Sequence, residues 1–352
     1  MTSSVFVREI EQVCTDLQIH SESTYTFRGE LNQLEVHPSV AATKLEAKST
    51  HAEPTNTETS KLLVHSLRDL FYNKCYIRDC AVDPSMSVDA NQLISDLKLA
   101  NNTIDTWDEG WKIYQIDPNG RVSVQKADRS RTANPGEFTK HSYTGMPLKN
   151  GDIVSLRVYP GSIHMSDSFY FAFGANLSDQ FDEFSLLRFY FNVSADKAAP
   201  LLSTLSQRLN YYAIPYRFKT LSWPQLYRRA DGTVLYVARR YYPIVASLLY
   251  EFRAYFSSQL RTEVPMFCKV FLPGLGLAED PRNGESFGMH RCRLMAQGLV
   301  NAWFDGTQSS ELRLYAIRDC FAQDGIDWER PYLNRSSIDL PSVETFLGSG
   351  FQ

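Results

Sequence analysis

The chain lacks most features that mark secreted, membrane and metal-dependent proteins. Its six cysteines are scattered, and no two of them form a C-x-x-C pair. Zinc sites and disulfide scaffolds need characteristic spacings, so neither is expected, and the thiols are predicted to be reduced and mostly buried. No segment approaches the roughly 18 apolar residues of a membrane span. The first residues lack the basic and apolar parts of a signal peptide, so we expect a cytoplasmic protein that does not contact membranes.

The common catalytic and phosphate-binding motifs are missing as well. The sequence has no G-K-[ST] phosphate loop, no G-x-G-x-x-G turn, no G-x-S-x-G elbow and no H-E-x-x-H helix. The net charge is −4, from 36 Lys and Arg against 40 Asp and Glu. That balance argues against a surface that coats nucleic acid, although it leaves room for a local basic pocket.

What the chain contains is enough for a sizeable core. It has 352 residues, of which 43% are hydrophobic and 22% charged, close to the average of globular domains. Helical spacing of apolar residues in 3–18 and 61–77 predicts a helical N-terminal region, 1–104, with a polar linker near 37–60. Residues 105–345 are predicted to form a second domain.

That second domain is predicted to combine strands and helices. Alternating or aromatic-rich segments indicate strands of a mostly antiparallel sheet at 152–160, 169–175, 186–194 and 215–221. Helical periodicity returns at 198–212, 241–260, 285–306 and 309–323. The predicted fold class is therefore α+β, with a helical N-terminal portion, a central mostly antiparallel sheet, and C-terminal helices packed on it.

Two of the predicted strands carry cations on one face. In LLRFYFNVS, Arg188 shares a face with Tyr190 and Asn192, while the apolar residues between them face a core. In PYRFKTL, Arg217 and Lys219 share a face in the same way. Desolvation and like charge can lower the pKa of a lysine that lies beside an arginine and between aromatic neighbours, and a neutral lysine is a competent base. Solvated faces that protect a sheet edge explain the same pattern.

Further cations are spread over the second domain. Asp231 is expected either to orient a neighbouring arginine, of which the segment carries Arg228, Arg229, Arg239 and Arg240, through a bidentate pair or to form an ordinary surface salt bridge. A glycine-bearing loop leads into a helix whose first turns carry His290 and Arg291, an arrangement that favours an anion. Single cations lie on predicted strands at Lys126 and Lys269. If three or four of these cations converge, a phosphate or carboxylate ligand is implied.

Several long phrases, in order, resemble one family. They include GDIVSLRVYP, FYFAFG, RFYFNVS, LNYYAIPYRFKTL, YRRADGTVLY, VPMFCKVFLPGLGLAEDPRNGESFGMHRCRLMAQGLVNAW and GIDWERPYLN. Over residues 105–340, about two-thirds of the chain, the sequence resembles the HopA-type effector family. That family is named for a type III secretion effector and includes the lyases of class V lanthipeptide and thioamitide biosynthesis.

The resemblance implies a phosphoserine/phosphothreonine lyase. A separate Ser/Thr kinase, acting alone or in a complex with the lyase, phosphorylates a precursor peptide. The lyase then eliminates phosphate to leave dehydroalanine or dehydrobutyrine. By motif, Lys219 is the expected base, and His290 is a second catalytic candidate.

The resemblance also assigns a phosphate-binding set. Lys126 could instead polarise the carbonyl beside the acidic Cα–H. No metal or organic cofactor is implied, because lysine and arginine supply both the base and the cations. The expected phosphate-binding residues are Lys126, Arg188, Arg217, Arg229, Lys269 and Arg291.

A second class of function fits the same residues. A non-catalytic effector-like protein could use a basic groove to hold a phosphorylated or acidic protein partner. Replacing Lys219 separates the two hypotheses, because only a lyase needs the base. Nucleotide binding at the glycine loop is a weaker third hypothesis, since no phosphate-loop motif accompanies it.

Overall fold

The computed structural model describes residues 4–34, 57–80, 88–140, 146–163, 165–307 and 309–341. Most of the predicted polar linker near 37–60 lies outside these residues. The chain forms two compact units. The first contains 1–78, 266–269 and 283–339, and the second contains 79–265, 270–282 and 340–352. All six cysteines are buried, as predicted, and form no disulfide among the described residues.

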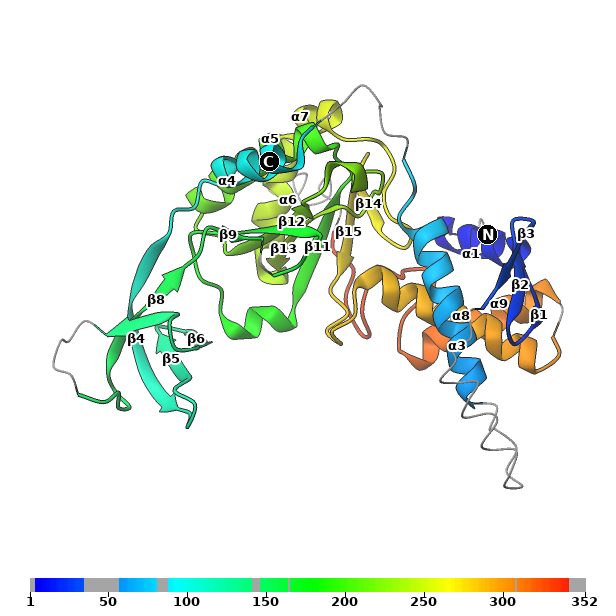
Figure 1. Ribbon diagram of the computed structural model, residues 1–352, viewed down its shortest axis with the longest axis horizontal. Helices are drawn as coiled ribbons and strands as arrows, with labels where there is room; N and C mark the ends of the chain where they lie inside the picture. Colours follow the sequence, from blue (N-terminus) through cyan, green and yellow to red (C-terminus); the bar gives the residue numbers. More distant parts are fainter. Residues whose placement is uncertain are drawn as a thin grey trace. The chain divides into compact units, whose positions relative to one another are not determined.

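The first unit is mainly helical (Figure 1). Its first helix begins where the Ser4 hydroxyl accepts the Val7 N–H at 3.3 Å, and the helix buries Val7, Ile10 and Val13 on one stripe. A three-stranded antiparallel sheet follows, which the helical prediction for 1–104 did not contain. The elements are α1 (Val5–Asp16), β1 (Leu17–Ser21), β2 (Thr24–Phe27), β3 (Glu30–Gln33), α3 (Thr57–Phe71), the short π-helix η1 (Tyr72–Tyr76), α8 (Phe287–Phe304) and α9 (Ser310–Gln323).

This division differs from the expected boundary between residues 104 and 105. Helices α8 and α9 return from the C-terminal part of the chain to the first unit, where α8 packs on α3 and α9. Two glycines of α8 permit this close approach. A Cβ at Gly288 would lie 2.3 Å from the Tyr76 ring, and one at Gly298 would lie 2.5 Å from the Ile317 backbone. Periodicity along one helix cannot show which distant segment it packs on.

Apart from Lys269, the first residue of β14, the second unit contains both larger sheets. The strand pairs from β15 to β9, and all those of the five-stranded sheet, are antiparallel. The α+β class with a mostly antiparallel sheet is thus confirmed. One sheet runs β6-β5-β4-β8-β7, and the other runs β14-β15-β11-β13-β12-β10-β9.

The strands of the five-stranded sheet are β4 (Thr106–Ile116), β5 (Val122–Lys126), β6 (Arg129–Ala133), β7 (Phe138–Lys140) and β8 (Ile153–Val158). Those of the seven-stranded sheet are β9 (Gly161–Ser162), β10 (Phe169–Phe173), β11 (Leu186–Phe191), β12 (Tyr216–Leu221), β13 (Thr233–Ala238), β14 (Lys269–Leu272) and β15 (Leu275–Glu279). The helices are α4 (Ala90–Ala100), η2 (Gln180–Phe184), α5 (Ala195–Tyr211), η3 (Pro224–Leu226), η4 (Arg239–Tyr241), α6 (Tyr242–Glu251) and α7 (Arg253–Gln259).

The seven-stranded sheet packs one face against α4, α5, α6 and α7 in the main core. Leu187, Phe189 and Phe191 of β11 point into this core, as the alternation predicted. The opposite face of β11 is buried too, since Arg188 is 8% exposed and Tyr190 is 3% exposed. A solvated face at β11 is therefore wrong. The strand lies between β13 and β15 in the middle of the sheet, so side chains of both neighbouring strands flank Arg188 and Tyr190.

Candidate functional site

Arginines and aromatic side chains line up across the sheet face that points away from the helices. The register pairs Arg188 of β11 with Tyr236 of β13, and Tyr236 with Arg217 of β12. The guanidinium carbons of Arg188 and Arg217 lie 5.3 Å and 4.5 Å from the centre of the Tyr236 ring. Such distances are typical of cation–π contacts. Two like charges are thus held on one aromatic side chain.

Each arginine has a different carboxylate partner. Nε of Arg188 donates to Asp280 at 2.8 Å, and the Arg188 side chain is only 9% exposed. Arg217 is 33% exposed, and its nearest carboxylate oxygen, on Glu183, is 3.8 Å away. Arg188 is therefore fixed by its partner, whereas Arg217 keeps donors that can reach a ligand.

Lys219 lies two residues beyond Arg217 on the same face. Its strand neighbours in register are Phe171 of β10 and Val234 of β13. The ammonium lies 3.7 Å from the centre of the Phe169 ring and 5.9 Å from that of Phe171. It makes no hydrogen bond or ion pair to any of the described residues. Two phenylalanine rings of β10 thus lie beside an amine that has no carboxylate partner among the described residues.

The surroundings lower the pKa of the Lys219 amine to about 8, from an ordinary value of 10.5. Burial is the largest cause, and repulsion from Arg188 is the next. Arg229 and Arg217 add to the repulsion, whereas Asp231 acts in the opposite direction. A substantial fraction of this amine is therefore neutral at a mildly basic pH, as the sequence pattern predicted.

Arg229 and Asp231 form the bidentate pair considered above. Nε of Arg229 donates to one carboxylate oxygen of Asp231 at 2.5 Å, and Nη2 donates to the other at 2.8 Å. The Asp231 side chain is 7% exposed, so this pair is not the ordinary surface salt bridge of the alternative interpretation. Asp231 thus orients a third guanidinium near Lys219.

The structure brings together four of the residues predicted for the site. We call them the basic cluster: Arg188, Arg217, Lys219 and Arg229. All four belong to the second unit. Arg188, Arg217 and Arg229 all act electrostatically on Lys219, so the predicted convergence of three or four cations is present, and such a group suits an anionic ligand.

Lys126 is placed outside the basic cluster. It ends β5 on the five-stranded sheet, and its ammonium lies 2.5 Å from an Asp108 carboxylate oxygen. The other Asp108 oxygen accepts the Trp111 indole N–H at 3.0 Å. The ammonium is therefore fixed to a carboxylate that also holds a core tryptophan.

Lys269 is the first residue of the edge strand β14, and its ammonium donates to Asp339 at 2.9 Å. The hydroxyl of Tyr332 donates to the second oxygen of the same carboxylate at 2.6 Å. The Lys269 ammonium also lies 5.4 Å from the Tyr332 ring centre. These contacts tie Lys269 to the segment before residue 340, and both belong to the first unit.

Arg291 and His290 lie in the interior of the first unit, on α8. The fully buried guanidinium of Arg291 donates to the carbonyl of Pro331 at 2.7 Å and to that of Leu333 at 2.9 Å. Its Nη1 lies 2.5 Å from Nδ1 of His290. In this arrangement Arg291 fastens the C-terminal segment to α8 rather than facing an open anion site.

The His290 imidazole is neutral in these surroundings. Burial and the neighbouring Arg291 lower its pKa to about 4. Because the Arg291 guanidinium can only donate, Nδ1 accepts, and the ring proton lies on Nε2, 3.1 Å from Asp324. An anion was expected at the start of α8. There the carboxylate of Glu285 already pairs with Arg293, at 2.9 Å.

Sequence reasoning missed several residues around the basic cluster. Tyr236 lies on β13, whose segment TVLYVA is buried throughout and shows no alternation to mark it as a strand. Asp280 directly follows β15, and only the β11–β15 pairing brings it to Arg188. The ring of Phe169 was detectable, because aromatic residues recur in FYFAF.

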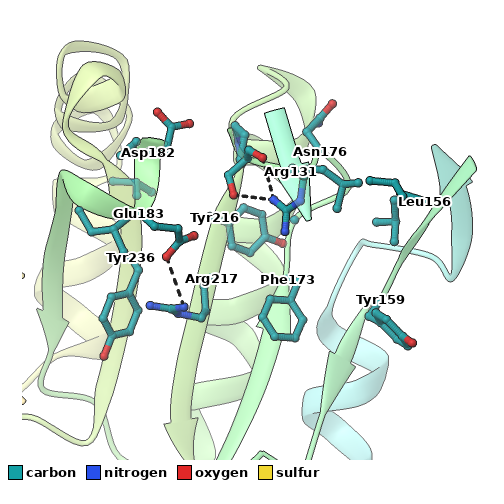
Figure 2. A pocket seen from close by; sticks show the side chains of 18 of the residues that line it. Arg131, Leu156, Tyr159, Phe173, Asn176, Asp182, Glu183, Tyr216, Arg217 and Tyr236 are labelled. Carbon is teal, nitrogen blue, oxygen red and sulfur yellow. Dashed lines mark hydrogen bonds and ion pairs between the residues drawn. The ribbon is translucent and has the colours of Figure 1, made fainter. Parts of the chain in front are cut away.

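A cavity of about 260 Å³ opens beside Arg217 and Tyr236 (Figure 2). One wall comes from β6 and β8 of the five-stranded sheet, and the other from β10, β12 and β13 of the seven-stranded sheet. Strand β6 is bonded to the loop after β10, because Arg129 donates to the Leu177 carbonyl at 3.1 Å and Arg131 to the Ser178 carbonyl at 2.7 Å. The cavity thus lies within the second unit and adjoins one end of the basic cluster.

Within the described residues, no group of three or more His, Cys, Asp and Glu residues is arranged to hold a metal ion. In the same part of the chain, no helix is long and apolar enough to cross a membrane.

Known proteins were compared with the chain by sequence and by structure. Two solved structures of effector proteins from Pseudomonas syringae are similar to it. The protein from pathovar tomato has a TM-score of 0.45 and 13% identity, over 85% of this chain and 98% of that one. The protein from pathovar syringae has a TM-score of 0.44 and 12% identity, over 78% of this chain and 97% of that one. No curated protein sequence matches the chain.

The sequence model of the HopA1 effector protein family matches residues 162–333. The matched range contains the whole basic cluster, together with Lys269, His290 and Arg291, and it excludes Lys126. The family resemblance predicted from the sequence is therefore confirmed over residues 162–333, the part of the chain that matches the HopA1 effector protein family.

Proposed function

We propose that this protein is a phosphoserine/phosphothreonine lyase, which eliminates phosphate from a kinase-phosphorylated precursor peptide. One observation carries the proposal. An amine whose pKa is lowered to about 8, Lys219, has arginines around it and no carboxylate partner among the described residues. A base beside a cluster of cations is the combination that β-elimination of phosphate requires.

The reaction assigns one role to the amine and another to the guanidinium groups. Neutral Lys219 removes the proton from Cα of the phosphorylated residue. The electrons of the C–H bond form the Cα=Cβ double bond, and the Cβ–O bond breaks. The oxygen leaves with its electron pair as part of inorganic phosphate. Phosphoserine gives dehydroalanine, phosphothreonine gives dehydrobutyrine, and the proton on Lys219 returns to water.

The guanidinium groups have graded roles in this proposal. Arg217 is the most open of the three, so it contacts the phosphate directly. Arg229 is oriented by Asp231, and Arg188 by Asp280. Both add positive charge where negative charge develops on the leaving oxygen. The proposal includes no cofactor, because these side chains supply the base and the cations.

The partners in this proposal are a phosphorylated precursor peptide and a separate Ser/Thr kinase, working in the cytoplasm. The products belong to the maturation of lanthipeptide- or thioamitide-type peptides. The scheme assigns no step to the four predicted site residues that lie outside the basic cluster, and their roles stay predictions. They are Lys126, Lys269, His290 and Arg291. Arg217, Arg229 and Arg188 suffice for the phosphate in the scheme above.

A second candidate is a non-catalytic effector-like protein that holds a phosphorylated or acidic partner. The matched family is described as one of effector proteins, and this observation favours the candidate. The same basic cluster would then bind an anion without removing a proton. The two functions differ in whether Lys219 is needed for chemistry or only adds charge.

The test is mass spectrometry of phosphoserine and phosphothreonine peptides incubated with the pure protein, alongside Lys219→Met. Binding of each peptide is measured in parallel by fluorescence anisotropy. A lyase converts the peptide to the dehydro residue only with unmodified Lys219, while both proteins bind it. Binding of both phosphopeptides without conversion of either contradicts the lyase and supports the binding protein.

A further inference from the structure

The cavity beside the basic cluster contains a guanidinium with unused donors. Nη1 of Arg131 donates to the carbonyl and the hydroxyl of Ser178, at 2.7 Å and 2.9 Å. Arg131 makes no other hydrogen bond and no ion pair with the described residues. Its Nε and Nη2 are left to the cavity, which the Arg131 side chain lines (Figure 2). Burial lowers its pKa without neutralising a guanidinium, so the group stays charged there.

A carboxylate of the protein itself approaches the same cavity. Glu183 lines it, lies 3.8 Å from Arg217, and is 50% exposed. A distance of 3.8 Å is too long for a good hydrogen bond, so the contact is loose. The Glu183 carboxylate thus occupies a position beside Arg217 that suits an anion, and the anionic group of a ligand can displace it.

The other carboxylates that line the cavity have partners. Asp182 accepts from Arg240 at 2.8 Å. Glu137 accepts the Asn134 backbone N–H at 2.8 Å and its side-chain amide at 3.1 Å. The remaining arginine of the lining, Arg157, is paired with Asp105 at 2.5 Å. Arg131 is therefore the cavity cation with no carboxylate partner among the described residues.

An exposed aromatic pair stands on the same short helix as Glu183. Phe181 and Phe184 of η2 are 65% and 63% exposed, and their ring centres are 6.5 Å apart. Residues three apart in a 3-10 helix share a face, so both rings stand together. An apolar surface beside a charged cavity suits a peptide better than a free ion.

The spacing along β12 relates this cavity to the base. Arg217 lines the cavity, and Lys219 follows two residues later on the same face. Two residues of extended chain span about 7 Å, both in this strand and in an extended peptide bound beside it. A peptide with its phosphorylated residue at Lys219 can therefore direct a nearby side chain into the cavity.

We propose that this cavity binds a second anionic side chain of the same peptide, a carboxylate or a phosphate within a few residues of the one eliminated. The inference rests on the proposed function for the position of the peptide. Arg131 and Arg217 bind the anionic side chain, and Glu183 moves away from Arg217 when that side chain enters the cavity. The lyase would thus prefer acidic or multiply phosphorylated segments.

The test uses peptides with one central phosphothreonine, flanked within four residues by glutamate, phosphoserine, alanine or lysine. Affinity is measured by fluorescence anisotropy in the Lys219→Met protein, where no elimination changes the peptide. We expect glutamate or phosphoserine flanks to bind about tenfold more tightly than alanine, as one charge-assisted contact allows. Comparing the two anionic flanks shows whether a carboxylate or a phosphate fits better.

Three substitutions in the same background assign the effect. Arg131→Gln should remove the preference for anionic flanks and leave the affinity for the alanine peptide unchanged. Glu183→Gln should strengthen binding of the anionic peptides, because it removes the competing carboxylate. Arg121→Gln, at an exposed arginine directly before β5, is the matched control and should change neither. Circular dichroism verifies that each variant is folded.

Equal binding of all flanks, or an equal loss for every peptide in Arg131→Gln, overturns this inference. Weaker anion binding in Glu183→Gln also overturns it. Failure of the proposed function gives a different result, in which unmodified protein forms no dehydro residue while the flank preference and its loss in Arg131→Gln are still observed.

Discussion

The ammonium of Lys219 lies 3.7 Å from the centre of the Phe169 ring. Lys219 is paired in register with Phe171, so Phe169, two residues away on β10, is its diagonal neighbour. Such a contact favours the charged amine by roughly 0.5 to 1 kcal/mol at an exposed site. Burial and three nearby guanidinium groups act in the opposite direction and prevail, so the pKa falls to about 8. The ring therefore positions the amine without keeping it protonated.

Lys219→Met is expected to stabilise the protein at pH 7. Folding lowers the pKa of this amine from 10.5 to about 8, so the unfolded chain binds more protons between these values. The stability of the unmodified protein should rise with pH across that window, and the full penalty of burying the charge applies below it. Methionine fills similar space without charge. We expect a gain of about 1 to 3 kcal/mol, the lower values reflecting partial exposure.

Urea unfolding at several pH values measures this difference. The gain should be largest at pH 7 and should fade as the pH approaches 10.5. Lys112→Met, at an exposed lysine of β4, provides the control and should be nearly neutral. A Lys219→Met protein less stable than the unmodified one at pH 7 would contradict the stated cause of the lowered pKa.

Arg217→Gln is expected to lower kcat/KM for phosphate elimination by about 100-fold, the loss typical of one donor that stabilises a leaving oxyanion. Glutamine keeps a polar hydrogen-bonding group but has neither the charge nor the full reach of the guanidinium. Arg228→Gln is the matched control, because Arg228 forms an exposed pair with Asp79 at 3.0 Å. Steady-state kinetics by phosphate release measures both. Equal effects of the two changes would indicate a diffuse charge effect and no phosphate contact at Arg217.

Asp231→Asn is expected to move the pH dependence of elimination toward acid. Asp231 raises the pKa of Lys219, opposing the repulsion from the arginines, so removing its charge should take that pKa below about 8. The rate at the plateau should also fall, because Arg229 loses the carboxylate that orients it. The pH profile of kcat/KM gives both quantities. A shift toward base would show that Asp231 does not act on the amine.

Arg291→Met is expected to reduce stability and leave elimination by the folded protein intact. The substitution leaves the carbonyls of Pro331 and Leu333 without a buried donor, at a cost of about 2 to 5 kcal/mol. Urea unfolding measures the loss, and Arg318→Met, at an exposed position of α9, is the control. A large rise in KM for the phosphopeptide, with stability unchanged, would instead support the phosphate-binding role predicted from the family motif.

The sequence allowed the basic cluster to be predicted only in part, for a physical reason. Alternation with a period of two follows from strand geometry, so it correctly placed Arg217 with Lys219 on one face of β12. It could not show that Arg188 shares a tyrosine with Arg217. That contact arises because β13 lies between β11 and β12, and strand order depends on long-range pairing.

The same limit explains the residues outside the cluster. Arg291 and Lys126 are cations on regular elements, as predicted, but their surroundings are set by distant segments. The carbonyls that hold Arg291 come from residues about one helix and one loop further along the chain. Asp108, which holds Lys126, lies on the neighbouring strand β4. A motif can identify a charged residue, whereas its partner follows only from the packed structure.

The pH dependence of kcat/KM for elimination from a phosphothreonine peptide tests the central claim most directly. A general base must be neutral, so the rate should rise tenfold per pH unit at low pH and level off near pH 8, the pKa of Lys219. A rate that keeps rising to about pH 10.5 would show a lysine of ordinary pKa. A rate that falls above pH 8 would show that the charged ammonium is needed, and it would contradict Lys219 as the base.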